Sequence, residues 1–510
     1  MTGPRDELSY WLQSAPGSPY PALEGPEAVD VAVIGGGIAG LSTAWELIKA
    51  GRRVAVLDAG RVAAGVTGNT TAKVTAQHGS IFAHLTDSAG REAARLYGRS
   101  QLDAMAHLAA IVAELGVDCE LEQKTAYSYS TREDQVGDLQ AEAAAARDAG
   151  LPAAFVTETG LPFDVAGAVR VTGQAQFHPR RFLIALAEGI AERGGLIFED
   201  SRVLDIEGGG PYRLRSANGE VTAADVVVTT GYPVFDKAKL FTRLTPRREL
   251  VLAAPIPAES DPDGMYVTSE DHMRSVRTAP YGDGRRLLII TGESFKPGEG
   301  DVAARFERLA TWAGVHFGAT GFRYRWAAQD NDTPDRLPFV GKASFGTGRV
   351  YVATGFGGWG MTNGVMSARL LTGLLTEDPR PWTDLYDPHR FHLREAVPIL
   401  KAQTQVAKHF IGDRVDPPGE ETAVGELACG KGTVLRVDGT PTAVYRDDDG
   451  SLHAVSAICT HLGCTVAFND AERTWECPCH GSRFATDGTV LQGPANEPLD
   501  RRPLPEEDDG

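Results

Sequence analysis

Two short runs near the C-terminal end combine cysteine and histidine at spacings that suit metal ligation. The run C-T-H-L-G-C covers residues 459–464, and C-P-C-H-G-S covers residues 477–482. Each run offers one thiolate and one imidazole, so a [2Fe–2S] cluster would have two thiolates on one iron and two imidazoles on the other. Neutral imidazole in place of thiolate removes negative charge and raises the reduction potential. The predicted metal ligands are Cys459, His461, Cys477 and His480.

A zinc site is the alternative interpretation, because Cys and His at short spacing also bind Zn²⁺. Each run carries one further cysteine, Cys464 or Cys479, for which a zinc site with two Cys and two His ligands has no use. Cys119 and Cys429 have no such neighbours, and their pattern is typical of small buried hydrophobic residues.

Residues 422–503 resemble the Rieske proteins of quinol-oxidising complexes. The resemblance implies a disulfide between Cys464 and Cys479, and a cluster-covering proline loop at Gly493-Pro494-Ala495. Ser482 stands where that family has a hydroxyl donor, but Phe484 stands where it commonly has Tyr. With one hydrogen bond fewer, we expect a potential below that of quinol-oxidising centres, within about −150 to +300 mV.

A second kind of site is predicted near the N-terminus. Val29–Ile34 is a continuous apolar run typical of a buried parallel strand, and it leads into a G-x-G-x-x-G sequence and a helical pattern. Such glycines permit a tight turn, close approach of the backbone to a pyrophosphate and close helix–strand packing. An acidic residue about 20 positions later suits the ribose hydroxyls. The predicted dinucleotide contacts are Gly35, Gly37, Ile38, Ala39, Gly40 and Asp58.

A second glycine cluster favours FAD over NAD. It follows the apolar strand Val350–Ala353, and its glycines allow backbone amides to approach a flat, electron-rich ring. A glycine-rich hairpin without a ligand is the alternative. The predicted contacts in this cluster are Gly355, Gly357, Gly358, Gly360, Met361 and Thr362.

From about residue 29 to 375 the chain resembles the D-amino-acid oxidase/glycine oxidase flavoenzymes. The matching motifs are V-D-V-A-V-I-G-G-G-I-A-G at 29–40, G-V-T-G-N-T-T at 65–71, Q-F-H-P at 176–179, the strand 225–231 and D-R-L-P-F-V-G at 335–341. The resemblance implies substrate bound over the flavin and hydride taken from carbon beside an amine. It adds Thr67, Gly68, Asn69, Thr70, Thr71, Val203 and Gly231 to the expected FAD contacts. Asn69 falls where related dehydrogenases carry a covalent histidine, so non-covalent FAD is expected, with His78 as the alternative attachment point.

Substrate-site residues are harder to assign. Arg274, Arg277 and Arg325 lie in segments that reach toward the expected pocket, and Arg suits a substrate carboxylate. His272 and Trp359 are candidates near the flavin. For the arginines, the alternative is a surface or structural role.

The expected fold class is an α/β FAD-binding domain (Rossmann-like, GR2-type) with an α+β substrate domain, plus a C-terminal all-β Rieske domain. The FAD-dependent part is expected at 28–377, with FAD-binding segments at about 28–100, 170–245 and 320–377 and substrate-domain segments at about 101–169 and 246–319. The other expected parts are an N-terminal extension at 1–27, a linker at 378–421 with a helix around 393–410, the Rieske domain at 422–503 and an acidic tail at 504–510.

Composition limits the partners and the location. The net charge of −18 argues against nucleic acid and against anionic lipid surfaces. No run approaches the ~20 apolar residues of a membrane-spanning helix, so no membrane anchor is expected. The polar N-terminus is unlike a secretory signal, and a cytoplasmic location is therefore expected.

Three functions are compatible with a flavin and a cluster in one chain. The first is an amine or amino-acid dehydrogenase whose FAD accepts a hydride and passes single electrons to the cluster and on to an external one-electron acceptor. The second is an FAD oxidase that uses O₂ and has a structural or sensing Rieske domain. The third is an electron-transfer module for another enzyme, which the absence of a second G-x-G-x-x-G sequence makes less favourable.

Overall fold

The computed structural model describes residues 8–235, 240–270, 272–343, 348–390, 424–425 and 427–503. The chain forms two compact units. The first unit comprises Met1–Ala238, Glu249–Ser294 and Arg308–Arg390, and the second comprises Lys239–Arg248, Phe295–Glu307 and Phe391–Gly510. The helix expected around 393–410 and the acidic tail at 504–510 lie outside the described residues.

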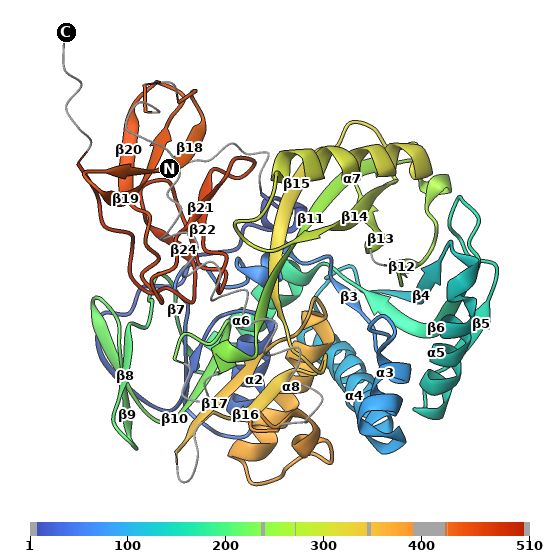
Figure 1. Ribbon diagram of the computed structural model, residues 1–510. Coiled ribbons are helices and arrows are strands. Elements are labelled where there is room, and N and C mark those ends of the chain that lie inside the picture. The colour runs from blue at the N-terminus through green and yellow to red at the C-terminus, as the bar shows by residue number, and fades with distance from the viewer. Residues whose placement is uncertain are drawn as a thin grey trace. The chain divides into compact units, whose positions relative to one another are not determined.

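An eight-stranded sheet forms one layer of the first unit (Figure 1). Its strands are β1 (Gly25–Ile34), β2 (Val54–Leu57), β7 (Leu196–Phe198), β8 (Asp205–Glu207), β9 (Tyr212–Arg215), β10 (Gly219–Gly231), β16 (Phe339–Lys342) and β17 (Val350–Thr354). The order is β16-β17-β10-β1-β2-β7, and all neighbours from β17 to β7 run parallel. Val31–Ile34 of β1 is buried throughout, as expected of a strand covered on both faces.

Helices connect and cover these strands. They are α2 (Ile38–Lys49), α6 (Pro179–Glu192) and α8 (Gly360–Leu375). α2 begins directly after the glycine turn and ends before Gly51, whose φ of 78° is the left-handed conformation typical of a helix C-terminus. α2 packs closely on α8, since a Cβ at Gly364 would lie 2.7 Å from Ile38 Cγ2.

A nine-stranded sheet forms the other layer. Its strands are β3 (Lys73–Val74), β4 (Glu122–Ser130), β5 (Ala153–Val156), β6 (Gly167–Gln176), β11 (Thr245–Ile256), β12 (Met265–Thr268), β13 (Arg274–Tyr281), β14 (Arg285–Phe295) and β15 (Tyr324–Asp332). Its order is β15-β11-β14-β13-β12-β4-β6-β3, with β5 on β6. Helices α3 (Ile81–Ala89), α4 (Arg91–Leu115), α5 (Val136–Asp148) and α7 (Val302–Phe317) complete this part. No helix among the described residues has the length and apolar character needed to cross a membrane.

The second unit carries two small antiparallel sheets. One contains β18 (Lys431–Val437), β19 (Thr440–Arg446) and β20 (Leu452–Ser456), and the other contains β21 (Ala467–Asn469), β22 (Thr474–Glu476), β23 (Arg483–Phe484) and β24 (Val490–Gln492). The turn between β18 and β19 is Asp438-Gly439, where both residues have positive φ, as a two-residue hairpin requires. The cysteine–histidine runs form the loops after β20 and β22.

The start of the chain is integrated into the first unit. Residues Tyr10–Ser14 form the short helix α1, and the Trp11 side chain is fully buried. Residues 1–27 are expected from sequence to be an extension. The low apolar content of this segment gave no indication that Trp11 is buried.

Candidate functional site

The glycine turn between β1 and α2 has no room for side chains. A Cβ at Gly40 would lie 1.8 Å from the Gly35 carbonyl oxygen, and one at Gly35 would lie 2.7 Å from the Thr229 carbonyl oxygen. Gly35 also has a φ of 109°. Close helix–strand packing therefore requires glycine here, as a dinucleotide-binding turn does.

Asp58 at the end of β2 is tied to this turn. Its carboxylate accepts hydrogen bonds from the Gly36 amide (2.7 Å) and the Gly60 amide (2.9 Å). Burial raises the pKa of Asp58, and the two amide hydrogen bonds oppose that rise. This placement suits the acidic residue predicted to face a ribose.

The segment at 67–72 is held by side chains from three distant elements. The Asn69 carbonyl accepts from Trp326 Nε1 (2.8 Å) and the Thr70 carbonyl accepts from Trp11 Nε1 (2.7 Å). The Thr71 carbonyl accepts from Arg277 (3.0 Å). The backbone that is expected to contact FAD is therefore fixed from α1, β13 and β15. The sequence gave no indication of Trp11 or Trp326 in this role.

Thr67 and Asn69 make local contacts within this segment. Thr67 Oγ1 accepts from the Ile38 amide (3.2 Å) at the start of α2. The Asn69 side-chain amide donates to the Gly65 carbonyl (2.9 Å). A Cβ at Gly68 would lie 2.6 Å from the Ala63 carbonyl oxygen, which explains the glycine.

The second glycine cluster connects β17 to α8. Gly357 and Gly358 have φ of 58° and 86°. Their amides donate to the Asn331 carbonyl (3.1 Å) and to Asp330 Oδ2 (2.8 Å) at the end of β15. Positive φ at successive glycines lets the loop keep its backbone close to a neighbouring group.

His78, Trp359 and Thr362 come together beside this loop. The His78 and Trp359 rings stack at 4.6 Å and 21°, and His78 Nε2 lies 3.0 Å from Thr362 Oγ1. His78 Nδ1 is hydrogen-bonded to the Tyr97 hydroxyl. Burial lowers the pKa of His78 to about 3, so the imidazole is neutral. Both ring nitrogens are engaged within the protein.

The other predicted residues are distributed differently. Arg277 is 1% exposed and donates to backbone carbonyls, so its guanidinium supports the fold around residues 71–72. Arg274 forms an ion pair with Glu293. Arg325 and His272 are exposed. Val203 is buried, and Gly231 ends β10 with its carbonyl accepting from Thr354.

Lys73 is a buried cation that the sequence analysis missed. It is 8% exposed, and its Nζ donates to Ser275 Oγ and Thr71 Oγ1. None of the ion pairs between described residues includes it. Burial, and secondarily the Arg277 charge, lower the pKa of Lys73 to about 7. The position of Lys73 between the apolar residues Ala72 and Val74 is the feature of the sequence that could have indicated its burial.

Substitution of Lys73 by methionine should flatten the pH dependence of stability. Between about pH 7 and the ordinary value of 10.5, the unfolded state binds more protons at this position, so stability rises with pH. The measurement is the unfolding midpoint temperature of the protein between pH 7 and 10. Lys49→Met is the control, because Lys49 pairs with Glu114 at the surface. Equal slopes in wild type and Lys73→Met would contradict the prediction.

The cysteine–histidine loops bring the four predicted metal ligands to one place in the second unit. The His461 and His480 rings lie 5.0 Å apart at 89°, and Cys459 and Cys477 are buried. Burial lowers the pKa of both imidazoles to about 4, so both are neutral, as ligation requires. A hydrogen bond with Cys477 lowers the pKa of Cys459 to about 7. Two thiols and two neutral imidazoles together fit a mixed-ligand [2Fe–2S] cluster.

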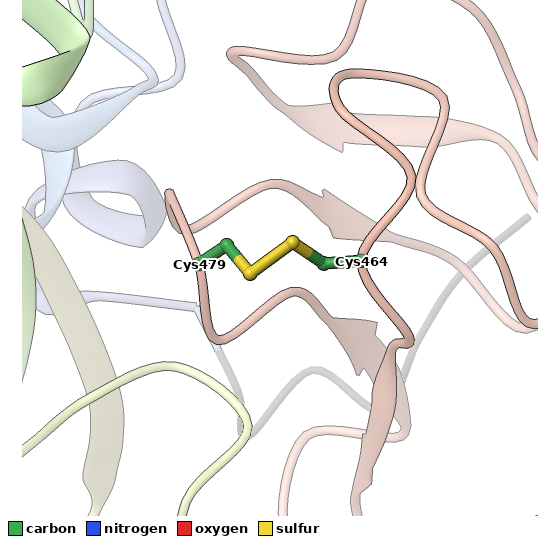
Figure 2. The surroundings of a disulfide bond; sticks show 2 residues. All are labelled: Cys464 and Cys479. Atoms are coloured by element: carbon green, nitrogen blue, oxygen red, sulfur yellow. A yellow bond between two sulfur atoms is a disulfide. The ribbon is translucent and has the colours of Figure 1, made fainter. Parts of the chain in front are cut away.

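A disulfide between Cys464 and Cys479 joins the two loops (Figure 2). The Cys477 sulfur lies within 4.8 Å of both disulfide sulfurs. Ser482 is buried beside Cys459, and its hydroxyl accepts from the Ala495 amide (3.0 Å). The proline loop at 493–495 therefore lies next to the ligand loops, as the resemblance implied.

Comparison with protein-family models identifies both parts. Residues 30–374 match the FAD dependent oxidoreductase family, and residues 420–503 match the Rieske [2Fe-2S] domain. The chain belongs to the FAD-dependent oxidoreductase family. It also carries a Rieske domain, and its cofactors are FAD and a [2Fe–2S] cluster. The expected fold class is confirmed.

Individual relatives agree with this assignment. A Rieske 2Fe-2S iron–sulfur protein of Bacillus subtilis, YhfW, is 35% identical over 495 residues, 96% of each chain. The cytochrome b6-f iron–sulfur subunit of Bigelowiella natans is 48% identical over 69 residues, 13% of this chain and 27% of the relative. The glycine oxidase of Geobacillus kaustophilus has a TM-score of 0.58 at 21% identity and covers 72% of this chain and 100% of its own. L-proline dehydrogenase from P. horikoshii has the same TM-score at 19% identity, with 72% and 98% coverage.

Proposed function

We propose that this FAD-dependent oxidoreductase oxidises an amine or amino acid and passes the electrons through its Rieske cluster to an external one-electron acceptor. The observation that carries the proposal is the presence, in one chain, of a flavoprotein fold and a complete set of Rieske ligands. Solved structures with the same fold include proteins named glycine oxidase, L-proline dehydrogenase and iminodiacetate oxidase, which supports a substrate with a C–N bond.

The reaction removes a hydride from the carbon beside the amine and a proton from the nitrogen, and gives an imine that water hydrolyses. FAD supplies the two-electron acceptor chemistry, and the cluster accepts one electron at a time. Gly35–Gly40 and Asp58 would hold the dinucleotide, and Trp11, Trp326 and Arg277 fix the backbone at 69–72. His78 stays neutral and orders Trp359 and Thr362 beside the second glycine loop. For the cluster, the proposed ligands are Cys459, His461, Cys477 and His480.

The test is anaerobic mixing with a panel of amines and amino acids. Flavin bleaching followed by the EPR signal of the reduced cluster is the expected result. A substrate that bleaches the flavin while the cluster stays oxidised would refute the electron relay. Reduction by NADH, with no response to any amine, would refute the substrate assignment and favour an electron-transfer module.

Substitution of Phe484 by tyrosine should raise the cluster potential. Phe484 is fully buried opposite Trp475 in β22, and tyrosine would restore the hydroxyl donor that the Rieske proteins of quinol-oxidising complexes commonly have at this position. A net hydrogen bond of ~1 kcal/mol corresponds to an increase of about 40 mV for a one-electron couple. Redox titration followed by EPR measures the shift, and the removal of a donor in Ser482→Ala should move the potential the other way. An unchanged or lower potential in Phe484→Tyr would contradict the prediction.

A further inference from the structure

The unit that carries the cluster includes chain from outside the Rieske segment. Lys239–Arg248 and Phe295–Glu307 group with the C-terminal part of the chain, although both lie within residues 30–374, which match the oxidoreductase family. The described part of the first segment comprises the short helix η4 (Leu240–Thr242) and the start of β11.

Arg248 is the most deeply buried charge that they contribute. Its side chain has no solvent exposure, and its guanidinium forms ion pairs with Glu476 and Glu472. The guanidinium also lies 5.6 Å from the ring centroid of Phe295, which belongs to the second contributed segment. A buried arginine of this kind is stable only because both carboxylates are present.

Glu476 is the point where this arginine meets the cluster loop. It is the last residue of β22, fully buried, and it directly precedes the proposed ligand Cys477. Besides Arg248, its carboxylate accepts from Asn469 Nδ2 (2.9 Å), Arg483 Nε (3.2 Å) and the Gly298 amide (3.0 Å). Arg248, Asn469 and Arg483 donate to Oε1, and the Gly298 amide donates to Oε2, so both carboxylate oxygens are held.

Charges balance within this network. Arg248 and Arg483 carry two positive charges, and Glu472 and Glu476 carry two negative charges; Arg483 contacts both carboxylates. Loss of Arg248 leaves one negative charge uncompensated, in a buried position one residue from a cluster ligand. Negative charge in a poorly solvated place opposes the addition of an electron, and therefore lowers a reduction potential.

The segment 240–248 also contacts His480, the second proposed ligand in the 477–480 loop. Phe241 in η4 packs edge-on against His480, with ring centroids 5.9 Å apart at 79°. His480 is 3% exposed. The segment 240–248 thus contacts Glu476, directly before the 477–480 loop, through Arg248, and His480, the last residue of that loop, through Phe241.

We propose that Arg248 is a positioning residue of the iron–sulfur centre, which fixes the Cys477 loop through Glu476 and sets part of the cluster potential. The Rieske domain of this chain therefore depends on the oxidoreductase part for a charge that it does not itself supply. The contacts of Arg248 act on the cluster loop alone, whichever substrate reduces the flavin.

The test uses the full-length protein with both cofactors. Arg248→Met, Arg248→Lys and the double variant Arg248→Met/Glu476→Gln are compared with wild type. The readouts are iron content, the g-values of the reduced cluster and its midpoint potential. Arg213→Met is the matched control, because Arg213 pairs with Glu207 at the surface of the first unit.

Arg248→Met is expected to shift the midpoint to lower potential and to change the g-values. Arg248→Lys should give a smaller shift, and the double variant should move back toward wild type because both charges are gone. Wild-type potential and g-values in Arg248→Met, with full iron content, would overturn the proposal. If Arg248→Met loses iron, the double variant decides: recovered iron with a near-wild-type potential supports the proposal, and no recovery overturns it.

Discussion

Substitution of Cys477 by serine is expected to abolish the Rieske EPR signal while the flavin remains reducible by substrate. The Cys477 thiol is buried next to Cys459 and the Cys464–Cys479 disulfide. Serine cannot replace a thiolate on iron, because its hydroxyl is a far poorer ligand for the soft Fe–S centre. The electrons would then have no exit through the cluster.

We expect turnover with a one-electron acceptor to fall by at least ~100-fold. Substitution of residues that only support a metal ligand already lowers activity by up to about 100-fold, and the loss of a ligand should cost no less. Anaerobic flavin reduction should stay within about threefold of wild type by stopped-flow absorbance, because the first unit is unchanged. Cys429→Ser is the matched control, since it makes the same chemical change at a free cysteine of the same unit, which is exposed and not buried as its sequence pattern suggested. Stoichiometric peroxide formation that is unchanged in Cys477→Ser would contradict the relay and favour an O₂-using oxidase.

The sequence gives its most specific predictions where residues that are neighbours in sequence share one expected function. The 459–464 and 477–482 runs hold all the proposed cluster ligands and the disulfide cysteines within a few residues of each other. The glycine turn at 35–40 is equally local, and its required residue type follows from contacts as short as 1.8 Å for an added Cβ. Such constraints act on residue identity directly, so they are visible in one sequence.

The parts that sequence missed depend on contacts between distant residues. Trp11 and Trp326 reach the 69–70 carbonyls across 59 and 257 positions, and Arg248 reaches Glu476 across 228. Nothing near Trp11 in the sequence distinguishes a buried tryptophan from an exposed one in a proline-rich extension. Arg277 illustrates the converse: its residue type suggested a carboxylate clamp, but four backbone carbonyls surround it.

Substitution of Gly40 by alanine is expected to cost most of the bound FAD. The added Cβ would lie 1.8 Å from the Gly35 carbonyl oxygen and 2.7 Å from Thr229 Oγ1, so α2 must move away from β1 at the turn that we propose receives the pyrophosphate. Overpacking of this kind costs about 1–3 kcal/mol. If that cost falls on cofactor binding, FAD affinity drops by roughly 5- to 150-fold, because each ~1.4 kcal/mol is a factor of ten.

The measurement is the ratio of flavin to protein absorbance in the purified enzyme, followed by titration of the apoprotein with FAD. Gly137→Ala is the matched control, because nothing lies within 4 Å of a Cβ at this exposed position in α5 and alanine favours the helix. The Rieske EPR signal provides an internal reference, since the iron–sulfur unit does not contain Gly40. Flavin loss with an intact EPR signal would place the effect at the β1–α2 turn, whereas wild-type FAD content and affinity in Gly40→Ala would show that this turn does not hold the pyrophosphate.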